Sequence, residues 1–513
     1  MRSKNSIINA IAAMVMYIVT ILASFLTQKI FIRTLGNEYL GLNGLFNNIL
    51  SMLAVVELGF GTAVIYNLYK PIADKDEKKI NALINFYRKT YNIIAIVIFA
   101  LGICILPFLE YFVGEVSIKE NINFLFILAL IDIVASYLLT YKRSVLYANQ
   151  KTYIVNIVHI GYTILVNILE IIFLLETKNY VTYLVIKIIF RILENIIITI
   201  IANKMYPFIK NGKKEKLDKE TKTEIMKKVK GLLFHKIGGT VVFSTDNIII
   251  SKFLGVVTVG LYSNYYMIIN AITSLLGQVF SSIVASIGNL LLEDNKEKHY
   301  KIYKNFLLVN SWLYMFCGAC LLCLIEPFIS LWIGEWYILE YGVLVVLVIN
   351  FYIQGMRKTC STFKEAAGIF YEDRYVPIFE AILNVVASIM LINKFGLMGV
   401  FIGTIISTAV IYLYSFPKFV YKKLFNRSYI QYLVEILKYF IITFVTIFIT
   451  AYLTNVIDIG KSNFTELIKN MIICIIVPNL IYFIIFCRTD EFKYFKEIFT
   501  RLIKERKKDE EIG

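Results

Sequence analysis

The sequence has few charged residues and few prolines, and both observations limit the class of protein that it can form. Asp, Glu, Lys and Arg make up 18% of the 513 residues, against about 25% in an ordinary soluble domain. This composition excludes a soluble protein. Seven prolines in the whole chain suit long helices that run without interruption. The alternating segments of about ten residues that an outer-membrane barrel requires are also missing, so a helical bundle is expected.

Cysteine offers neither a disulfide framework nor a metal site. All seven cysteines lie in or beside apolar runs, and none pairs with another in an external loop. Cys317, Cys320 and Cys323 recur every three residues, but no neighbouring His or second Cys pair completes a set of metal ligands. Packing between helices is the better interpretation. The chain also lacks the pattern GxxxxGK[ST], so ATP is not expected as the direct energy source.

Long apolar runs fill the chain instead. Apolar residues account for 58% of it and the mean hydropathy is +0.68. Runs of about 18 or more residues, each long enough to cross a bilayer, recur from residue 7 to residue 487. We therefore predict an all-α integral membrane protein with about 14 transmembrane helices. The expected spans are 7–32, 40–69, 84–108, 121–147, 152–176, 180–204, 230–253, 257–291, 302–327, 337–364, 375–393, 397–422, 431–455 and 467–487.

Basic residues alternate between the connections in a way that indicates the orientation. Lys and Arg crowd into every second connection, and the largest group lies between Lys204 and Lys230. Because cytoplasmic connections are enriched in Lys and Arg, both termini are predicted to lie on the cytoplasmic side of a bacterial inner membrane. The formal net charge of +16 is explained by these connections, so nucleic-acid binding is not expected.

The two halves of the chain resemble each other at a nearly constant spacing. The pairs LG at 35–36 and GL at 41–42 recur at 254–255 and 260–261, as is typical of transporters built from repeats. The run from Pro107 to Glu115 has a counterpart from Pro327 to Glu335. Two such lobes would face a central cleft that opens alternately by rocking. The predicted parts are an N-terminal six-helix lobe (1–204), a basic cytoplasmic linker (205–229), a C-terminal six-helix lobe (230–425), two additional transmembrane helices (426–488) and a basic cytoplasmic tail (489–513).

Several motifs resemble one known family. Residues 35–46 (LGNEYLGLNGLF) and 57–63 (ELGFGTA) look like the opening helical hairpin of bacterial polysaccharide repeat-unit flippases, in the multidrug/oligosaccharidyl-lipid/polysaccharide exporter superfamily. In the second half, 244–255 (STDNIIISKFLG), 259–265 (VGLYSNY) and 285–289 (ASIGN) are similar to the same family. The resemblance covers most of the chain. It implies movement of undecaprenyl-pyrophosphate-linked oligosaccharide from the cytoplasmic to the outer leaflet, for capsule, O-antigen or exopolysaccharide assembly.

Cationic residues inside or beside the spans are candidates for binding the pyrophosphate. An ionisable group inside a span is costly, which makes each one a functional candidate. His235 and Lys236 lie a turn or more inside the seventh span, where they either meet the pyrophosphate or extend toward the cytoplasmic headgroups. Arg88, Arg143 and Arg357 lie near the cytoplasmic side and either recruit the same group or contact anionic lipids.

Amide and acidic side chains complete the candidate site. Asn43, Asn47 and Asn264 belong to repeat-related spans and either bind sugar hydroxyls or hydrogen-bond between helices. Glu57, near mid-membrane, is the leading candidate for coupling transport to a proton or cation, with a buried structural carboxyl as the alternative. Asp246 is a second candidate for that role, or it pairs structurally near the outer boundary. No cofactor is expected beyond a coupling H+ or Na+.

A transporter is expected, not an enzyme. A membrane glycan polymerase needs catalytic groups in a sizeable external loop, and the external connections here are short. A drug or cation antiporter of the same superfamily is a nearer alternative, but residues 7–32 hold no Asp or Glu where such antiporters resemble one another in an acidic site. A teichoic-acid or peptidoglycan-precursor flippase stays open. The expected partners are the lipid-linked oligosaccharide, membrane lipids, a glycan polymerase and glycosyltransferases.

Overall fold

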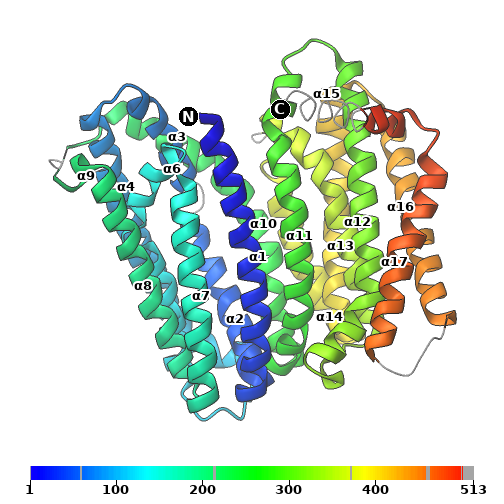
Figure 1. Cartoon of the computed structure of the whole chain (residues 1–513), viewed down its shortest axis with the longest axis horizontal. Helices are drawn as coiled ribbons and strands as arrows, with labels where there is room; N and C mark the ends of the chain where they lie inside the picture. Colours follow the sequence, from blue (N-terminus) through cyan, green and yellow to red (C-terminus); the bar gives the residue numbers. More distant parts are fainter. Residues whose placement is uncertain are drawn as a thin grey trace, which may run out of the picture. The chain divides into compact units, whose positions relative to one another are not determined.

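The computed structural model describes residues 2–57, 60–211, 215–369, 372–457, 463–497 and 500, and every secondary-structure element among them is helical. The chain divides into two compact units, Met1–Ser263 and Asn264–Gly513. Within each unit the long helices run side by side (Figure 1). The predicted all-α class is confirmed.

Several helices of the first unit are capped by a polar residue, and the helices pack against one another in pairs. They are α1 (Arg2–Leu35), α2 (Asn37–Leu53), η1 (Ala54–Glu57), α3 (Phe60–Ala73), α4 (Glu77–Val113), α5 (Ile122–Tyr137), η2 (Thr140–Lys142), α6 (Arg143–Ala148), α7 (Thr152–Thr177), α8 (Tyr180–Met205), α9 (Pro207–Asn211) and α10 (Lys219–Leu254). Asp76, Asn121, Asn179 and Asp218 each accept a hydrogen bond from a backbone N–H three residues later, which stabilises a helix start. α1 packs on α7, α7 on α8, α5 on α4 and α8, and α10 on α2.

The second unit is built around α12. Its helices follow α11 (Val256–Leu290), which begins in the first unit, and are α12 (Lys296–Trp332), η3 (Glu335–Tyr337), α13 (Tyr341–Ala366), α14 (Val376–Val410), η4 (Ile411–Lys422), α15 (Lys423–Phe425), α16 (Tyr429–Val456) and α17 (Asn463–Phe486). α12 packs on α13, α16 and α17. The buried Tyr352 hydroxyl joins three of these helices, because it lies 3.1 Å from Ser311 Oγ and accepts from Thr443 Oγ1 at 2.8 Å.

Ten helical runs in the described part of the chain are long and apolar enough to cross a membrane. Their outward side chains are large and apolar, as at Ile96, Ile430 and Phe448, which are 68%, 72% and 71% exposed. Such a surface suits lipid and not water. The other predicted spans are helical too: α8 and α10 carry several charges, and the span 40–69 is divided by η1. The chain is a multi-pass membrane protein.

Glycines at equivalent repeat positions share one backbone conformation. Gly36, between α1 and α2, has φ 89°, and Gly255, between α10 and α11, has φ 84°. Gly114 and Gly334, which end α4 and α12, have φ 72° and 114°. Residues with a Cβ rarely adopt these values. The sequence repeat therefore corresponds to a repeated turn geometry, while the predicted lobe boundaries stay a prediction.

A close crossing joins α2 to the start of α11 within the first unit. A Cβ on Gly41 would lie 1.9 Å from the backbone oxygen of Val256. A Cβ on Gly260 would lie 2.6 Å from the oxygen of Asn37 and 3.2 Å from the nitrogen of Gly41. Only glycine allows two helix backbones to approach this closely. Gly41 and Gly260, the second pair of glycines at equivalent positions of the repeat, thus lie in contact with one another.

Candidate functional site

A break in the fourth predicted span places an arginine inside the first unit. α5 ends where Leu138 turns extended, at ψ 132°, and Leu139 follows in the left-handed region at φ 64°. The chain then restarts as η2 and α6, and Arg143 is the first residue of α6. Its Nη2 donates to Asn195 Oδ1 of α8 at 2.6 Å and lies 3.4 Å from Glu194 Oε1. The break therefore places the guanidinium of Arg143 against α8.

Glu194 is the centre of an ion network that four helices build. Its Oε1 also lies 3.0 Å from His159 Nδ1 of α7, and its Oε2 lies 3.6 Å from Arg191 Nη1, one turn earlier on α8. Arg191 Nε and Lys187 Nζ each lie 3.5 Å from an oxygen of Asp132 on α5. We call this group the α8 network: Asp132, Arg143, His159, Lys187, Arg191 and Glu194.

The α8 network has a buried centre at mid-helix, and its other members are partly exposed. The Glu194 side chain is 1% exposed, and it lies fourteen residues after Tyr180, about 21 Å along α8 at about 1.5 Å per residue. Each charge there depends on its partners, because removing one member of a buried ion pair leaves an uncompensated charge. Ionisable groups at this depth are functional candidates by default.

A cavity of about 480 Å³ opens beside the α8 network. Its polar lining includes the guanidinium of Arg88 and the amide of Asn92 on α4, and the amide of Asn195 on α8. Lys142, within electrostatic range of Arg88, donates from Nζ to Asn203 Oδ1 at 2.7 Å. The full lining is Arg88, Asn92, Ala135, Leu138, Leu139, Tyr141, Ile192, Asn195 and Ile196. We call it the Arg88 cavity.

Positive charge exceeds negative charge around the Arg88 cavity. Arg88, Lys142 and Arg143 border it or contact its lining, and among the described residues Arg143 is ion-paired only to Glu194. The buried Nε of Arg143 donates no hydrogen bond to the described residues. Together with the amides of Asn92 and Asn195, these groups can bind an anion that carries hydroxyl groups. Of the predicted site residues, Arg88 thus lines this cavity, and Arg143 contacts its lining through Asn195.

The predicted asparagines are placed differently from one another. Asn43 Oδ1 accepts from the hydroxyl of Tyr180 at 3.3 Å, which is a hydrogen bond between helices. Asn47 is exposed on α2. Asn264 is fully buried at the start of the second unit. Of the three, Asn47 has the exposure that binding a sugar hydroxyl requires.

The predicted coupling acids lie in the first unit. Glu57, at the end of η1, accepts a hydrogen bond from the hydroxyl of Tyr91, whose ring packs edge-on against Tyr87 with centroids 4.3 Å apart. Asp246 on α10 is 7% exposed, and its Oδ1 accepts no hydrogen bond from the described residues. Asp246 is thus held away from bulk water, as a coupling acid needs, whereas Glu57 is partly exposed.

The remaining predicted cationic residues belong to α13 and α10. Arg357 on α13 donates to both oxygens of the buried Glu380 at 2.6 and 3.1 Å and to Gln354 at 2.9 Å, so its charge is balanced within the second unit. His235 and Lys236 belong to α10, but their side chains lie outside the described part of the structure.

Sequence reasoning missed His159 and underestimated the charges of α8. Lys187, Arg191 and Glu194 have helical spacing, which suggests pairs along one helix. Three of the six members of the α8 network come from other helices, however. The available signal was that ionisable residues occur in three successive apolar runs. A single sequence does not show which of these residues come into contact when the helices pack.

Comparisons with known proteins agree on family and fold. The family model described as "Polysaccharide biosynthesis protein" matches residues 6–285. A structure of the lipid II flippase MurJ in an inward closed conformation is similar, with a TM-score of 0.63 and 16% identity over 94% of this chain and 99% of that one.

Two structures of transporters of the MOP superfamily are also similar. An inward-facing MATE transporter has a TM-score of 0.61 and 15% identity, over 76% of this chain and 91% of that one. A transporter from Pyrococcus furiosus, whose binding pocket is described as reversed in polarity, has a TM-score of 0.55 and 15% identity, over 79% and 92%. No curated protein sequence matches the chain. At these identities the structures show the fold alone.

Proposed function

The chain belongs to the polysaccharide biosynthesis protein family, and from this premise we propose that it flips undecaprenyl-pyrophosphate-linked oligosaccharide repeat units across a bacterial cytoplasmic membrane. The direction is from the cytoplasmic to the outer leaflet, by alternating access, for capsule, O-antigen or exopolysaccharide assembly. Both termini would be cytoplasmic, and the glycosyltransferases and polymerase of the same glycan would be partners. The protein would bind and release its substrate without chemistry.

The observation that carries this proposal is the Arg88 cavity. A diphosphate headgroup cannot enter the hydrocarbon unaccompanied, because an ion in a low-dielectric medium loses its hydration. Arg88, Lys142 and Arg143 supply compensating charge, and guanidinium groups bind phosphate oxygens in pairs. The cavity volume of about 480 Å³ lies within the range of about 300–1,000 Å³ typical of small-molecule sites. That range suits a diphosphate and the first sugar.

The other predicted residues have defined roles in the proposal. His235 and Lys236 would provide further positive charge along the path, and Asn47, the exposed asparagine of the three predicted, would contact sugar hydroxyls. Arg357, Asn43 and Asn264 are left with structural roles, because Arg357 is paired with Glu380, Asn43 accepts from Tyr180 and Asn264 is fully buried. Glu57 and Asp246 would take up the coupling H+ or Na+. A carboxyl suits this role because its charge changes when it binds a proton.

Arg88→Gln is expected to slow flipping at least tenfold, because it removes one charge-assisted hydrogen bond to the phosphate. The protein is reconstituted in liposomes that carry a fluorescent undecaprenyl-pyrophosphate oligosaccharide. Exposure of the sugar to a membrane-impermeant reagent is followed with and without a pH gradient. Glu57→Gln in the same assay is expected to abolish the response to the gradient while flipping down the concentration gradient continues.

Arg33→Gln is the matched control, since Arg33 is exposed at the end of α1 and should flip at the wild-type rate. Equal rates for Arg88→Gln and wild type would remove the Arg88 cavity from the transport path. Efflux of a cationic dye without any flipping would make the protein an antiporter. Preference for an undecaprenyl-pyrophosphate muropeptide over the oligosaccharide would assign it to peptidoglycan-precursor transport.

A further inference from the structure

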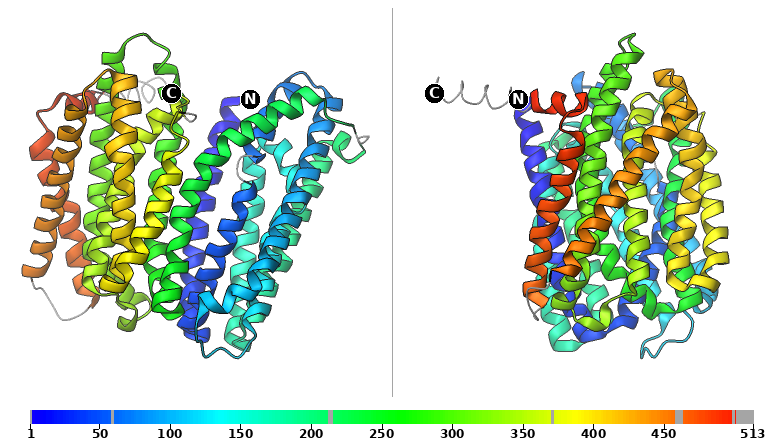
Figure 2. Two further views of the ribbon diagram at one scale, coloured as in Figure 1. Left: turned by 180° about the vertical axis from the view of Figure 1, so that it is seen from behind. Right: turned by 90° about the vertical axis from the view of Figure 1, so that its right-hand side faces the viewer.

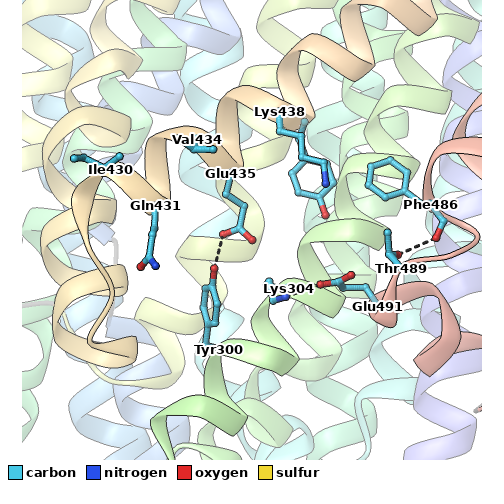
Figure 3. Close-up of a pocket in the computed structure, with 11 residues that line it drawn as sticks. Tyr300, Lys304, Ile430, Gln431, Val434, Glu435, Lys438, Phe486, Thr489 and Glu491 are labelled. Carbon is cyan, nitrogen blue, oxygen red and sulfur yellow. Dashed lines mark hydrogen bonds and ion pairs between the residues drawn. The ribbon is translucent and has the colours of Figure 1, made fainter.

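A second cavity, of about 370 Å³, lies in the second unit where α12 and α16 begin and α17 ends. Figure 3 shows its side chains converging from these helices and from the segment after α17. That segment turns away from the direction of α17, and residues 490–497 are helical again (red in Figure 2). We call the cavity the α16 pocket. It is lined by Tyr300, Lys304, Ile430, Gln431, Val434, Glu435, Lys438, Tyr439, Phe486, Thr489 and Glu491.

One wall of the α16 pocket faces the membrane. Ile430 and Val434 line it and are 72% and 62% exposed, and the same apolar face of α16 continues through Leu437 and Ile441 at 59% and 55%. Exposed apolar side chains on a membrane-spanning helix contact acyl chains. An occupant of this pocket therefore arrives from the bilayer and is amphipathic.

The interior of the α16 pocket carries both signs of charge. Lys304 Nζ donates to Glu491 Oε1 at 2.7 Å. Burial raises the pKa of Glu491, but the hydrogen bond from Lys304, a backbone hydrogen bond and the charges of Lys304 and Lys438 together hold that pKa below its usual value. Lys438 lies with Nζ 5.5 Å from the ring centroid of Phe486 and makes no ion pair among the described residues. Two ammonium groups and two carboxyls thus share one small space.

Glu435 has a carboxylate oxygen that can accept a hydrogen bond from a ligand. Its Oε2 accepts hydrogen bonds from the hydroxyls of Tyr300, at 3.2 Å, and Tyr421, at 2.5 Å. Its Oε1 accepts none from the residues that the structure describes. Figure 3 shows Glu435 and Lys438 one turn apart on α16, above Lys304 and Glu491. A pocket that holds both carboxylates and ammonium groups suits a ligand that carries a positive and a negative charge.

We propose that the α16 pocket binds the headgroup of a phospholipid with a primary ammonium and a phosphodiester, of the phosphatidylethanolamine type. The ammonium donates to Glu435 Oε1 and Glu491, and the phosphate accepts from Lys438. An anionic headgroup would meet two carboxylates, and a purely cationic one would meet two lysines. A trimethylammonium group has no N–H to donate. Tyr439 and Phe486 stack on one another with centroids 5.6 Å apart, so they form no open cage for it.

The test compares three lipids with identical acyl chains on the purified full-length protein, by native mass spectrometry. The lipids are phosphatidylethanolamine, phosphatidylcholine and phosphatidylglycerol. The wild-type protein is expected to retain phosphatidylethanolamine at about tenfold lower concentration than the other two. Glu435→Gln should remove that preference, because it deletes a charge-assisted hydrogen bond from the ammonium that distinguishes this lipid. Lys438→Gln should weaken retention of all three lipids, because each of them carries the phosphate. Neither variant needs new packing, since Gln keeps an acceptor for the two tyrosines and Lys438 is exposed.

Glu340→Gln and Lys394→Gln, both exposed in the second unit, are the matched controls and should keep the wild-type preference. Tighter retention of phosphatidylglycerol than of phosphatidylethanolamine would overturn the proposal in favour of an anion site. Equal retention of phosphatidylcholine would show that the ammonium is not recognised. A preference that survives Glu435→Gln, with retention unchanged in Lys438→Gln, would place the lipid elsewhere. Every outcome is independent of whether the protein flips an oligosaccharide.

Discussion

Glu194→Ala is expected to lower the free energy of unfolding by about 3–5 kcal/mol, the usual result of removing one partner from a buried ion pair. The variant leaves Arg143 and His159 without an ion pair among the described residues, and Arg191 with Asp132 as its remaining partner. Thermal unfolding in detergent would show a fall in Tm of roughly 6 °C or more, at about 2 °C per kcal/mol for a unit of this size. The flipping assay should lose its signal as well, because Arg143 is no longer held beside the Arg88 cavity.

Glu176→Ala is the control for this result, since Glu176 is exposed near the end of α7 and its removal should change Tm by less than about 1 °C. Glu194→Gln separates charge from hydrogen bonding, because it keeps an acceptor for His159. An unchanged Tm in Glu194→Ala would mean that water reaches the α8 network and compensates its charges. In that case the buried-pair argument would fail.

Gly41→Ala is expected to destabilise the protein by about 3 kcal/mol, at the upper end of what overpacking usually costs. The new Cβ would lie 1.9 Å from the backbone oxygen of Val256. No side-chain rotation relieves a clash with a backbone atom, so α2 and α11 must move apart. Thermal unfolding in detergent and the yield of monodisperse protein both report this change.

Two other helical glycines provide the matched comparison. A Cβ on Gly161 of α7, or on Gly277 of α11, meets nothing within 4 Å. Gly161→Ala and Gly277→Ala should therefore leave Tm unchanged or raise it, since alanine is the better helix former by up to about 1 kcal/mol. If Gly41→Ala behaved like these two, the close crossing of α2 and α11 would not exist in the folded protein.

The helical fold was predictable because its signal is local. An apolar run long enough to cross a bilayer has one stable conformation there, in which every backbone group is paired within the helix. The predicted spans fall mostly on helix in the described part of the chain, and the paired glycines Gly36 and Gly255 have similar φ values. The division of the span 40–69 by η1 was not predicted, because the turn at Ala54–Glu57 has no proline.

The candidate site was predictable only in part. Arg88 and Arg143 could be named because a cation in an apolar run is costly wherever it lies. The partners of Arg143 could not, because Leu138 and Leu139 break the helix without a glycine or proline. That break determines which way Arg143 points. His159 has no charged neighbour in sequence, and its link to Glu194 exists only after α7 packs on α8.

The crossing of α2 and α11 also bears on how such a chain could arise. A residue on the axis of a twofold homodimer touches its own counterpart, since the same patch is used on both subunits. Gly41 and Gly260 occupy equivalent places in the repeat, and the backbone of one abuts the other. Their contact has the geometry of an isologous interface retained after gene duplication and fusion. A six-helix ancestor with this glycine would have assembled with a second copy of itself, and the basic segment 205–229 would be the later covalent tether.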